Sequence, residues 1–164
     1  MTEESVPFFL HREKVRPEWI DYNGHMNVAY YTLTFDHATD ALFDHLDLGI
    51  DYVRRAGCSL FSAEAHTVFK QEVAEGASIS FTAQLLGADE KRVHIFLRMF
   101  NEDEGYLAAT IEFVSIHVDM KARRATPFPE EARRRINDLV AAHASLPVPP
   151  EAGRAVTMTG RKRG

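Results

Sequence analysis

Apolar side chains recur in steps of three and four through residues 31–46, the spacing that gathers them on one face of a helix. That face consists of Tyr31, Phe35, Ala38, Leu42 and Leu46. Acidic residues lie mostly off it, at Asp36, Asp40, Asp44 and Asp47. Gly49 follows the last apolar position, where helices commonly end, so the pattern predicts one long amphipathic helix.

From Gly57 onward the period changes to two, which is typical of half-buried strands. In 78–85, apolar and polar residues alternate strictly. Similar strands are expected at about 62–72, 92–101 and 107–120, after a first strand through 7–15, with turns at 75–77, 87–90 and 101–105. Short connections favour antiparallel neighbours, which predicts that the last four strands follow one another as hairpins.

A final helix should begin near Pro129, a residue suited to a first helical turn. Its apolar face consists of Ile136, Leu139, Val140 and His143. The predicted fold class is α+β, an antiparallel five-stranded sheet against one long helix, with a C-terminal helix added. We expect a single domain over residues 1–145 and an extended, poorly ordered tail over the Pro- and Gly-rich 146–164.

Composition and charge narrow the classes of function. A chain of 164 residues with 45% hydrophobic residues is the size of one domain with its own core. The net charge of -5 offers nucleic acid no general attraction. Cys58 is the single cysteine, and the first residues do not read as a leader, so we expect a cytoplasmic protein without disulfides. No apolar run approaches the ~20 residues that span a bilayer, and no membrane partner is expected.

The stretch WIDYNGHMNVAYY, residues 19–31, concentrates polar and turn-forming residues between aromatic ones. Together with the long helix and the strands, it resembles the hotdog-fold acyl-CoA thioesterases of the 4-hydroxybenzoyl-CoA thioesterase type over about residues 8–120. Further segments resemble the betainyl-CoA thioesterases of carnitine metabolism; they are 17–27, 38–42, 64–66, 87–96, 117–120 and 142–155. The resemblance implies a hotdog fold and hydrolysis of a small acyl-CoA, with betainyl-CoA as the expected substrate.

The resemblance also implies catalytic roles in this stretch. Asp21 matches the family's catalytic carboxylate, and a backbone amide near Asn27 or Val28 would polarise the thioester carbonyl. Unpaired N–H groups and the positive end of the helix dipole suit that second role. His25 and Asn27 are expected to support the turn. Read alone, Asp21 could equally be a turn or capping aspartate.

A betaine group would need aromatic faces and a carboxylate around its trimethylammonium, because that cation offers no hydrogen. The residues expected to bind the substrate are Trp19, Tyr22, Tyr30, Tyr31, Glu64 and His66. Glu64 and His66 lie two apart on one strand and so on one face, which we expect to border the acyl pocket under the helix. The alternatives are core packing for the aromatic residues and a solvent-facing edge for the polar pair.

Coenzyme A carries phosphates, for which Lys91 and Arg92 at the 87–90 turn are the candidate ligands; a solvated hairpin tip is the alternative. The basic stretches 121–124 and 133–135 could serve instead. Seven histidines are candidate metal ligands: His25, His37, His45, His66, His94, His117 and His143. They form no helical pair with an acidic residue between and have no cysteine cluster, so we expect no metal and no cofactor beyond the CoA of the substrate.

Three alternatives stay open at this stage. They are a thioesterase for another short or aromatic acyl-CoA, a hydratase or dehydratase on the same scaffold, and a non-catalytic acyl-CoA-binding module. Release of free thiol from an acyl-CoA would exclude the non-catalytic binding module. A single sheet with one covering helix leaves an edge strand exposed, so a homodimer or a dimer of dimers is expected.

Overall fold

The computed structural model describes residues 8–159 of the chain. Its helices and strands follow in the order β1 (Phe8–Lys14), the 3₁₀ helix η2 (Pro17–Trp19), α1 (Val28–His45), α2 (Ile50–Ala56), β2 (Cys58–Phe69), β3 (Ser78–Ala88), β4 (Arg92–Asn101), β5 (Tyr106–Asp119), β6 (Arg124–Ala125) and α3 (Glu130–His143). The predicted α+β class, long helix and C-terminal helix are confirmed. None of the helices among the described residues is both long and apolar enough to cross a membrane.

The strands form one antiparallel sheet in the order β1-β3-β4-β5-β2, with β6 paired to β5. The prediction of four strands in hairpin succession is therefore wrong for β2, which pairs with β5 at the far edge instead of with β3. Residues 70–77 carry the chain from β2 to the other side of the sheet. A connection of eight residues is long enough for that crossing, whereas the two-residue loops of tight hairpins are not.

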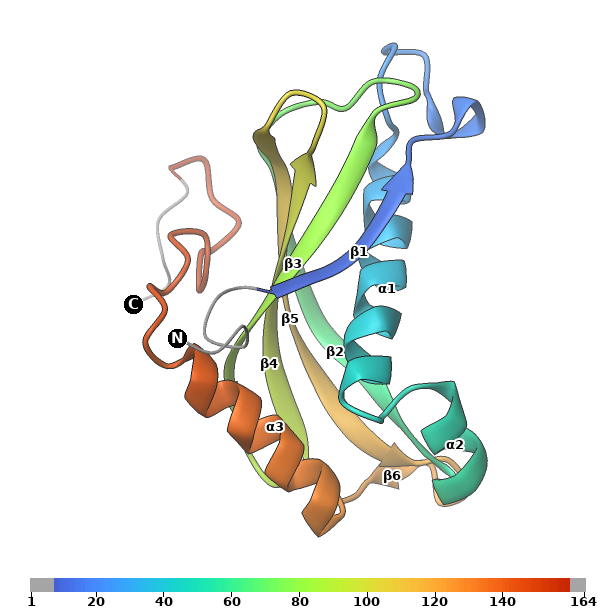
Figure 1. Cartoon of the computed structure of the whole chain (residues 1–164), viewed down its shortest axis with the longest axis vertical. Helices are drawn as coiled ribbons and strands as arrows, with labels where there is room; N and C mark the ends of the chain where they lie inside the picture. The colour runs from blue at the N-terminus through green and yellow to red at the C-terminus, as the bar shows by residue number, and fades with distance from the viewer. Residues whose placement is uncertain (1–7, 160–164) are drawn as a thin grey trace.

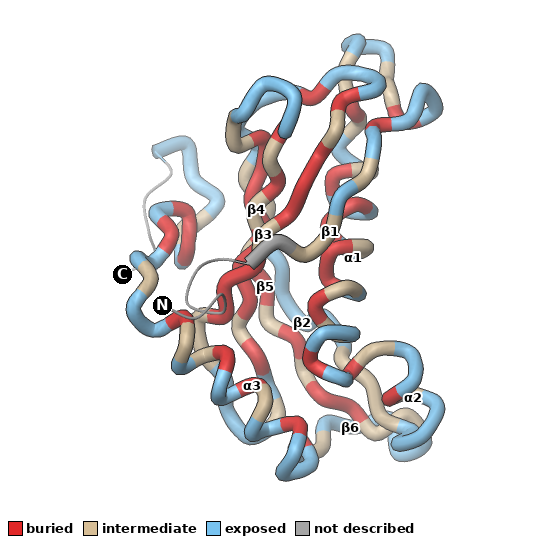
Figure 2. The backbone as a smooth tube through the Cα atoms, in the orientation of Figure 1, coloured by how far each residue is buried: buried red, intermediate tan, exposed pale blue. Residues whose placement is uncertain are grey.

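The long helix α1 packs its apolar stripe on one face of the sheet (Figure 1). All five predicted stripe residues are buried, and the ring of Phe35 meets Phe81 of β3 edge to face at 5.5 Å between centroids. Burial is concentrated on the central strands and on this inner side of α1, while the middle of β2 is exposed (Figure 2). The helix–sheet interface is thus the core, and β2 is its open edge.

Three short elements were not predicted from the sequence pattern. Helix α2 follows Gly49, so that glycine lies between two helices rather than ending the helical region. Strand β6 is a two-residue addition to the edge of β5, and the 3₁₀ helix η2 has three residues. All three are too short to show a period of their own.

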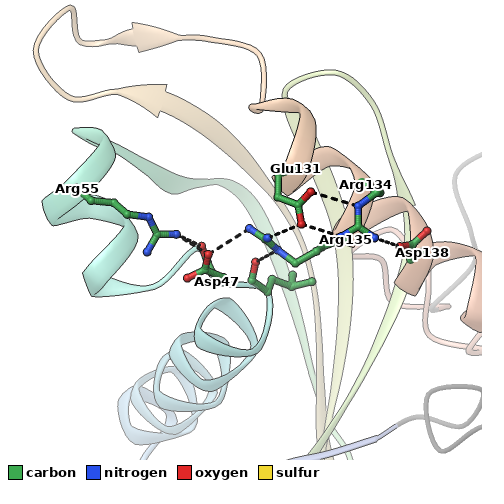
Figure 3. Close-up of polar contacts among 7 residues, drawn as sticks. Asp47, Arg55, Glu131, Arg134, Arg135 and Asp138 are labelled. Carbon is green, nitrogen blue, oxygen red and sulfur yellow. Dashed lines mark hydrogen bonds and ion pairs between the residues drawn. The ribbon is translucent and has the colours of Figure 1, made fainter.

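The end of α1 is fastened to α2 and α3 by a polar network (Figure 3). Asp47 accepts ion-pair contacts from Arg55 and Arg135, and Arg135 also donates from Nε to the carbonyl of Leu46 at 2.9 Å. Glu131 completes the network through Arg135 at 3.1 Å. These contacts fix the C-terminal end of α1.

The segment after α3 was expected to be extended and poorly ordered, and this is wrong for its described part, residues 146–159. The segment forms turns, and Glu151 and Ala152 in it are buried. Gly153 donates its N–H to Glu112 at 2.7 Å, and Gln84 donates to the carbonyl of Pro147 at 3.2 Å. Because Glu112 and Gln84 alternate with residues that face α1, the segment covers the opposite face of the sheet.

Candidate functional site

The loop between η2 and α1 is a closed turn that begins and ends on the same bridge. Ile20 and Met26 pair as an isolated antiparallel bridge, and Asp21 donates its N–H to the carbonyl of His25 at 3.1 Å. Gly24 closes the turn with an N–H bond to the carbonyl of Asp21 at 3.0 Å, at a φ of 82° that favours glycine. The quoted polar residues therefore build one rigid turn at the start of α1.

The carboxylate of Asp21 lies across the mouth of this turn. Its Oδ1 accepts the backbone N–H of Asn23 at 2.8 Å, and its Oδ2 accepts Nδ2 of Asn27 at 3.2 Å. The side chain is half-buried. Two donors on opposite oxygens fix the carboxylate while leaving it within reach of solvent.

Asn27 is the N-cap of α1. Its Oδ1 accepts the N–H of Ala29 at 2.9 Å, which satisfies one of the helix's first donors. Among the described residues no acceptor is found for the N–H of Val28, the first residue of the helix. Asn27 thus links the carboxylate of Asp21 to a free donor at the positive end of the helix dipole.

His25 belongs to the same turn but faces away from Asp21. Its Nδ1 lies 3.3 Å from the carbonyl of Met26, and its Nε2 lies 3.8 Å from Glu72. Met26 in turn donates its N–H to the carbonyl of Val73 at 2.8 Å. These contacts tie the turn to the 70–77 crossing, which fits the expected supporting role of His25.

The four aromatic residues around the turn occupy different environments. Trp19 and Tyr31 are buried in the core, with 3% and 4% of their surface exposed. Tyr30 stacks on Trp19 at 5.4 Å between ring centroids. Tyr22, next to Asp21, is 97% exposed. Of these four, Tyr22 and the half-buried Tyr30 offer a face to a ligand. Burial raises the pKa of Tyr31 to about 12, so its hydroxyl stays protonated at neutral pH.

A groove of about 480 Å³ runs from the start of α1 between that helix and strands β2 and β5. The sequence prediction named none of its lining residues as part of the site; they include Ala29, Thr32, Leu33 and Asp36 of α1 and Phe113 of β5. The four helical positions follow the i, i+3, i+4, i+7 pattern, so they form a second stripe beside the buried one. That spacing is the signal by which the groove could have been found.

Glu64 and His66 do share a face of β2, but it is the face opposite α1, so the expected position under the helix is wrong. They pair in register with Val114 and Glu112. There they line a second cavity of about 560 Å³ together with His94, whose Nε2 lies 2.7 Å from Glu112. In one chain, therefore, the polar pair and the Asp21 turn are not brought together.

Lys91 and Arg92 lie at the β3–β4 turn, as predicted, and each faces a carboxylate of the same turn. Arg92 donates from Nε to Asp89 at 2.7 Å, and Lys91 lies 3.3 Å from Glu90. Hydrogen bonds from the Lys91 backbone and the Arg92 side chain lower the pKa of Asp89 to about 2. The turn's positive charges are thus already balanced, although both side chains reach solvent.

Comparisons with known proteins point to one family. The profile of the thioesterase-like superfamily matches residues 15–136. The betainyl-CoA thioesterase of Pseudomonas aeruginosa is 42% identical over 142 residues, 87% of this chain and 89% of that protein. The L-carnitine dehydrogenase/betainyl-CoA thioesterase of Rhizobium meliloti is 37% identical over 98% of this chain, which spans only 32% of that longer protein.

A solved structure from Staphylococcus aureus, the SAV2348 protein in complex with CoA, superposes with a TM-score of 0.85 at 27% identity. The match covers 93% of this chain and 97% of that one. The predicted hotdog fold is confirmed. From the superfamily profile and the high identity to a full-length relative, the chain belongs to the thioesterase-like superfamily.

Proposed function

We propose that this protein hydrolyses betainyl-CoA to glycine betaine and CoA. The observation that carries the proposal is the Asp21 carboxylate at the N-terminus of α1, 3.2 Å from the capping Asn27 and next to the free N–H of Val28. The choice of substrate is supported by the 42% identical betainyl-CoA thioesterase. This chain spans about a third of the length of the fused relative from Rhizobium meliloti.

The proposed chemistry needs a carboxylate near the carbon of the thioester carbonyl and a hydrogen-bond donor near its oxygen. The Val28 N–H would stabilise the negative charge that develops on the carbonyl oxygen. Asp21 would either attack the carbonyl carbon or take a proton from the attacking water. In both routes the C–S bond breaks, CoA leaves as its thiol, and the elements of water are added. No cofactor is required.

The two routes can differ in which carboxylate receives the oxygen atom of water: that of Asp21 or that of the released acid. In a single turnover in heavy-oxygen water, nucleophilic attack by Asp21 ends with a labelled oxygen in the Asp21 carboxylate when the anhydride is hydrolysed at the Asp21 carbonyl. General-base catalysis leaves Asp21 unlabelled and labels the released acid. A label found by mass spectrometry in the peptide that contains Asp21 would therefore demonstrate the nucleophilic route, whereas an unlabelled peptide fits general-base catalysis or hydrolysis of the anhydride at the acyl carbonyl.

The decisive experiment is thiol release from a panel of acyl-CoAs that includes betainyl-CoA and its neutral analogue 3,3-dimethylbutanoyl-CoA. The two acyl groups have nearly the same shape, so an apolar pocket would favour the neutral one. Cation–π contacts are worth ~0.5 to 2 kcal/mol each, so a pocket with an aromatic face and a carboxylate should favour the cation in kcat/KM. Equal values of kcat/KM, or a preference for the neutral analogue, would indicate a thioesterase for another acyl-CoA. Binding without thiol release would indicate a non-catalytic module.

Within this proposal, Asp36 in the groove beside α1 contributes the carboxylate that holds the cation. Asp36→Asn should erode the preference for betainyl-CoA more than it slows the neutral analogue. Asp51→Asn, an equal loss of charge at an exposed position of α2, is the matched control. An unchanged preference in Asp36→Asn would remove Asp36 from the cation site.

We further infer that two copies of the chain pair along β2, alone or within a dimer of dimers. The middle of this edge strand is exposed, and Leu33, Phe61 and Phe69 add exposed apolar surface of 39%, 39% and 48%. Pairing would cover the edge. Ala63→Lys at this edge should lower the molar mass in light scattering, whereas Ala56→Lys on α2 should not. A monomeric wild type would contradict this inference.

We also propose that the protein is located in the cytoplasm.

A further inference from the structure

A polar cluster outside the proposed active site joins the first strand to the long helix. It consists of His11 and Glu13 on β1 and His37 on α1. Nε2 of His11 lies 3.2 Å from Oε1 of Glu13, and Nδ1 of His37 lies 3.0 and 3.2 Å from the two oxygens of Glu13. All three side chains are partly buried.

The backbone holds this cluster in place from two elements. His11 and Glu13 are two residues apart on a strand, so both side chains leave the same face of β1. That face lies against α1, and the ring of His11 packs against Phe81 at 5.9 Å between centroids. His37 precedes the buried Ala38 on the helix. The three donors are therefore fixed by the core.

The donor set suits a divalent transition-metal ion. One nitrogen from each histidine and one carboxylate oxygen lie within 4.8 Å of one another. Ligands at the ~2.0–2.2 Å typical of Zn²⁺ in a tetrahedral site are about 3.3 Å apart. The distances of 3.0 to 3.2 Å around Glu13 are close to that spacing. Two imidazoles and one carboxylate would leave a fourth position for water.

We infer that His11, Glu13 and His37 form a binding site for Zn²⁺ or a similar transition-metal ion. In the metal-free protein the two rings must donate N–H bonds to the shared carboxylate; the ion would replace those hydrogens. The acidic row Asp36, Asp40 and Asp44 on the same helix makes the surroundings negative. Imidazole ligands disfavour Mg²⁺ and Ca²⁺, which take oxygen.

This site revises the expectation of no metal. That expectation rested on helical histidine pairs and cysteine clusters, and His11 was not among the histidines considered. A His-x-Glu pair on a strand facing a histidine on a helix has no fixed spacing in the sequence. Only the packing of β1 on α1 brings the donors together.

The test is titration of the chelator-treated full chain with Zn²⁺ alone, followed by calorimetry. We expect about one ion per chain, with release of protons as the rings lose their hydrogens. His37→Gln and Glu13→Gln should each weaken binding by at least about tenfold, as loss of a ligand requires. His45→Gln, on the last turn of the same helix, is the matched control and should bind as the wild type does.

Thermal melting gives a second readout that does not depend on catalysis. Because the ion would bind only the folded chain, Zn²⁺ should raise the Tm of the wild type and of His45→Gln, and Mg²⁺ should not. Circular dichroism of the variants without metal checks that they fold. Undetectable binding by the wild type, or equal Zn²⁺ binding by all three variants, would overturn the site. The titration uses no acyl-CoA, so its result is independent of the proposed thioesterase activity.

Discussion

Asp21 accepts hydrogen bonds from one backbone donor and one side-chain donor, one on each carboxylate oxygen. Asp21→Asn keeps the size of the side chain but cannot act as base or nucleophile. We expect turnover to fall ~10²- to 10⁴-fold, the usual cost of losing a general base. Thiol release measures this, with melting temperature and binding of a non-hydrolysable analogue nearly unchanged.

Asn23 provides the control for that substitution. Only its backbone N–H contacts Asp21, so Asn23→Ala should retain both the contact and the rate. A kcat of Asp21→Asn within a few-fold of the wild type would remove Asp21 from the mechanism.

The residues of the candidate site could be predicted from the sequence where they are contiguous in it. The family resemblance named Asp21, His25 and Asn27 together, and the structure holds all three in one closed turn, which is encoded locally. The burial of Trp19 and Tyr31 could not be read in the same way, because an aromatic side chain beside a polar turn can point into the core or away from it. The groove on α1 depends on its contact with β5, which no local pattern records.

Asn27 has two roles: its side chain caps helix α1, and it also donates a hydrogen bond to Asp21. Asn27→Ala should lower stability by about 0.5 to 2 kcal/mol through loss of the cap. Asn27→Asp keeps the cap but sets a second carboxylate beside Asp21, so it should slow turnover with a far smaller loss of stability. Urea melts and thiol release on both variants separate the two roles; equal loss of stability in both would contradict the capping role.

The acidic row of α1 predicts a dependence of stability on pH. Partial burial and the neighbouring Asp36 and Asp44 raise the pKa of Asp40. A raised pKa means that the folded state favours the protonated acid, so the stability that it contributes at low pH is lost as pH rises through that pKa. Asp40→Asn should therefore raise the melting temperature at neutral pH and not at about pH 3, where carboxyls are protonated.

Thermal melts across this range measure the difference between Asp40→Asn and the wild type. Asp51→Asn removes an exposed carboxylate that pairs with Arg54, so it should give no gain at neutral pH. A constant difference between Asp40→Asn and the wild type at all pH values would contradict the electrostatic cause.

Among the elements, the strands were predicted within a few residues, but their neighbours were not. The bounds follow from alternation, which is local, whereas β2 could join β3 or cross to β5 with the same pattern of side chains. The face of Glu64 and His66 was misjudged for a related reason. The register of β2 shifts between Ser62 and Glu64, and such a bulge changes which side the following residues occupy.

In the molecule as a whole, some neighbouring strands of the sheet are close in sequence and others are far apart in sequence. Strands β3, β4 and β5 form a meander closed by short turns, whereas β1 pairs with β3 and β2 pairs with β5 across long separations. Distant pairings form later because their loops cost more entropy to close. Pulsed hydrogen exchange during refolding should protect the amides of β4 before those of β1 and β2. Earlier protection of β1 would contradict this order.

The place of β1 beside β3 also matters while the chain is being made. Lys14 pairs with Ser78, so the first strand leaves the ribosome more than sixty residues before its partner. At ~5–20 residues per second, that is a wait of roughly 3 to 13 seconds with an unpaired strand in the open. During that time β1 can meet another nascent chain on the same messenger, because its own β3 has not yet been made. Slower translation of residues 15–78 should therefore lower the yield of soluble protein, while slower translation of later residues should not.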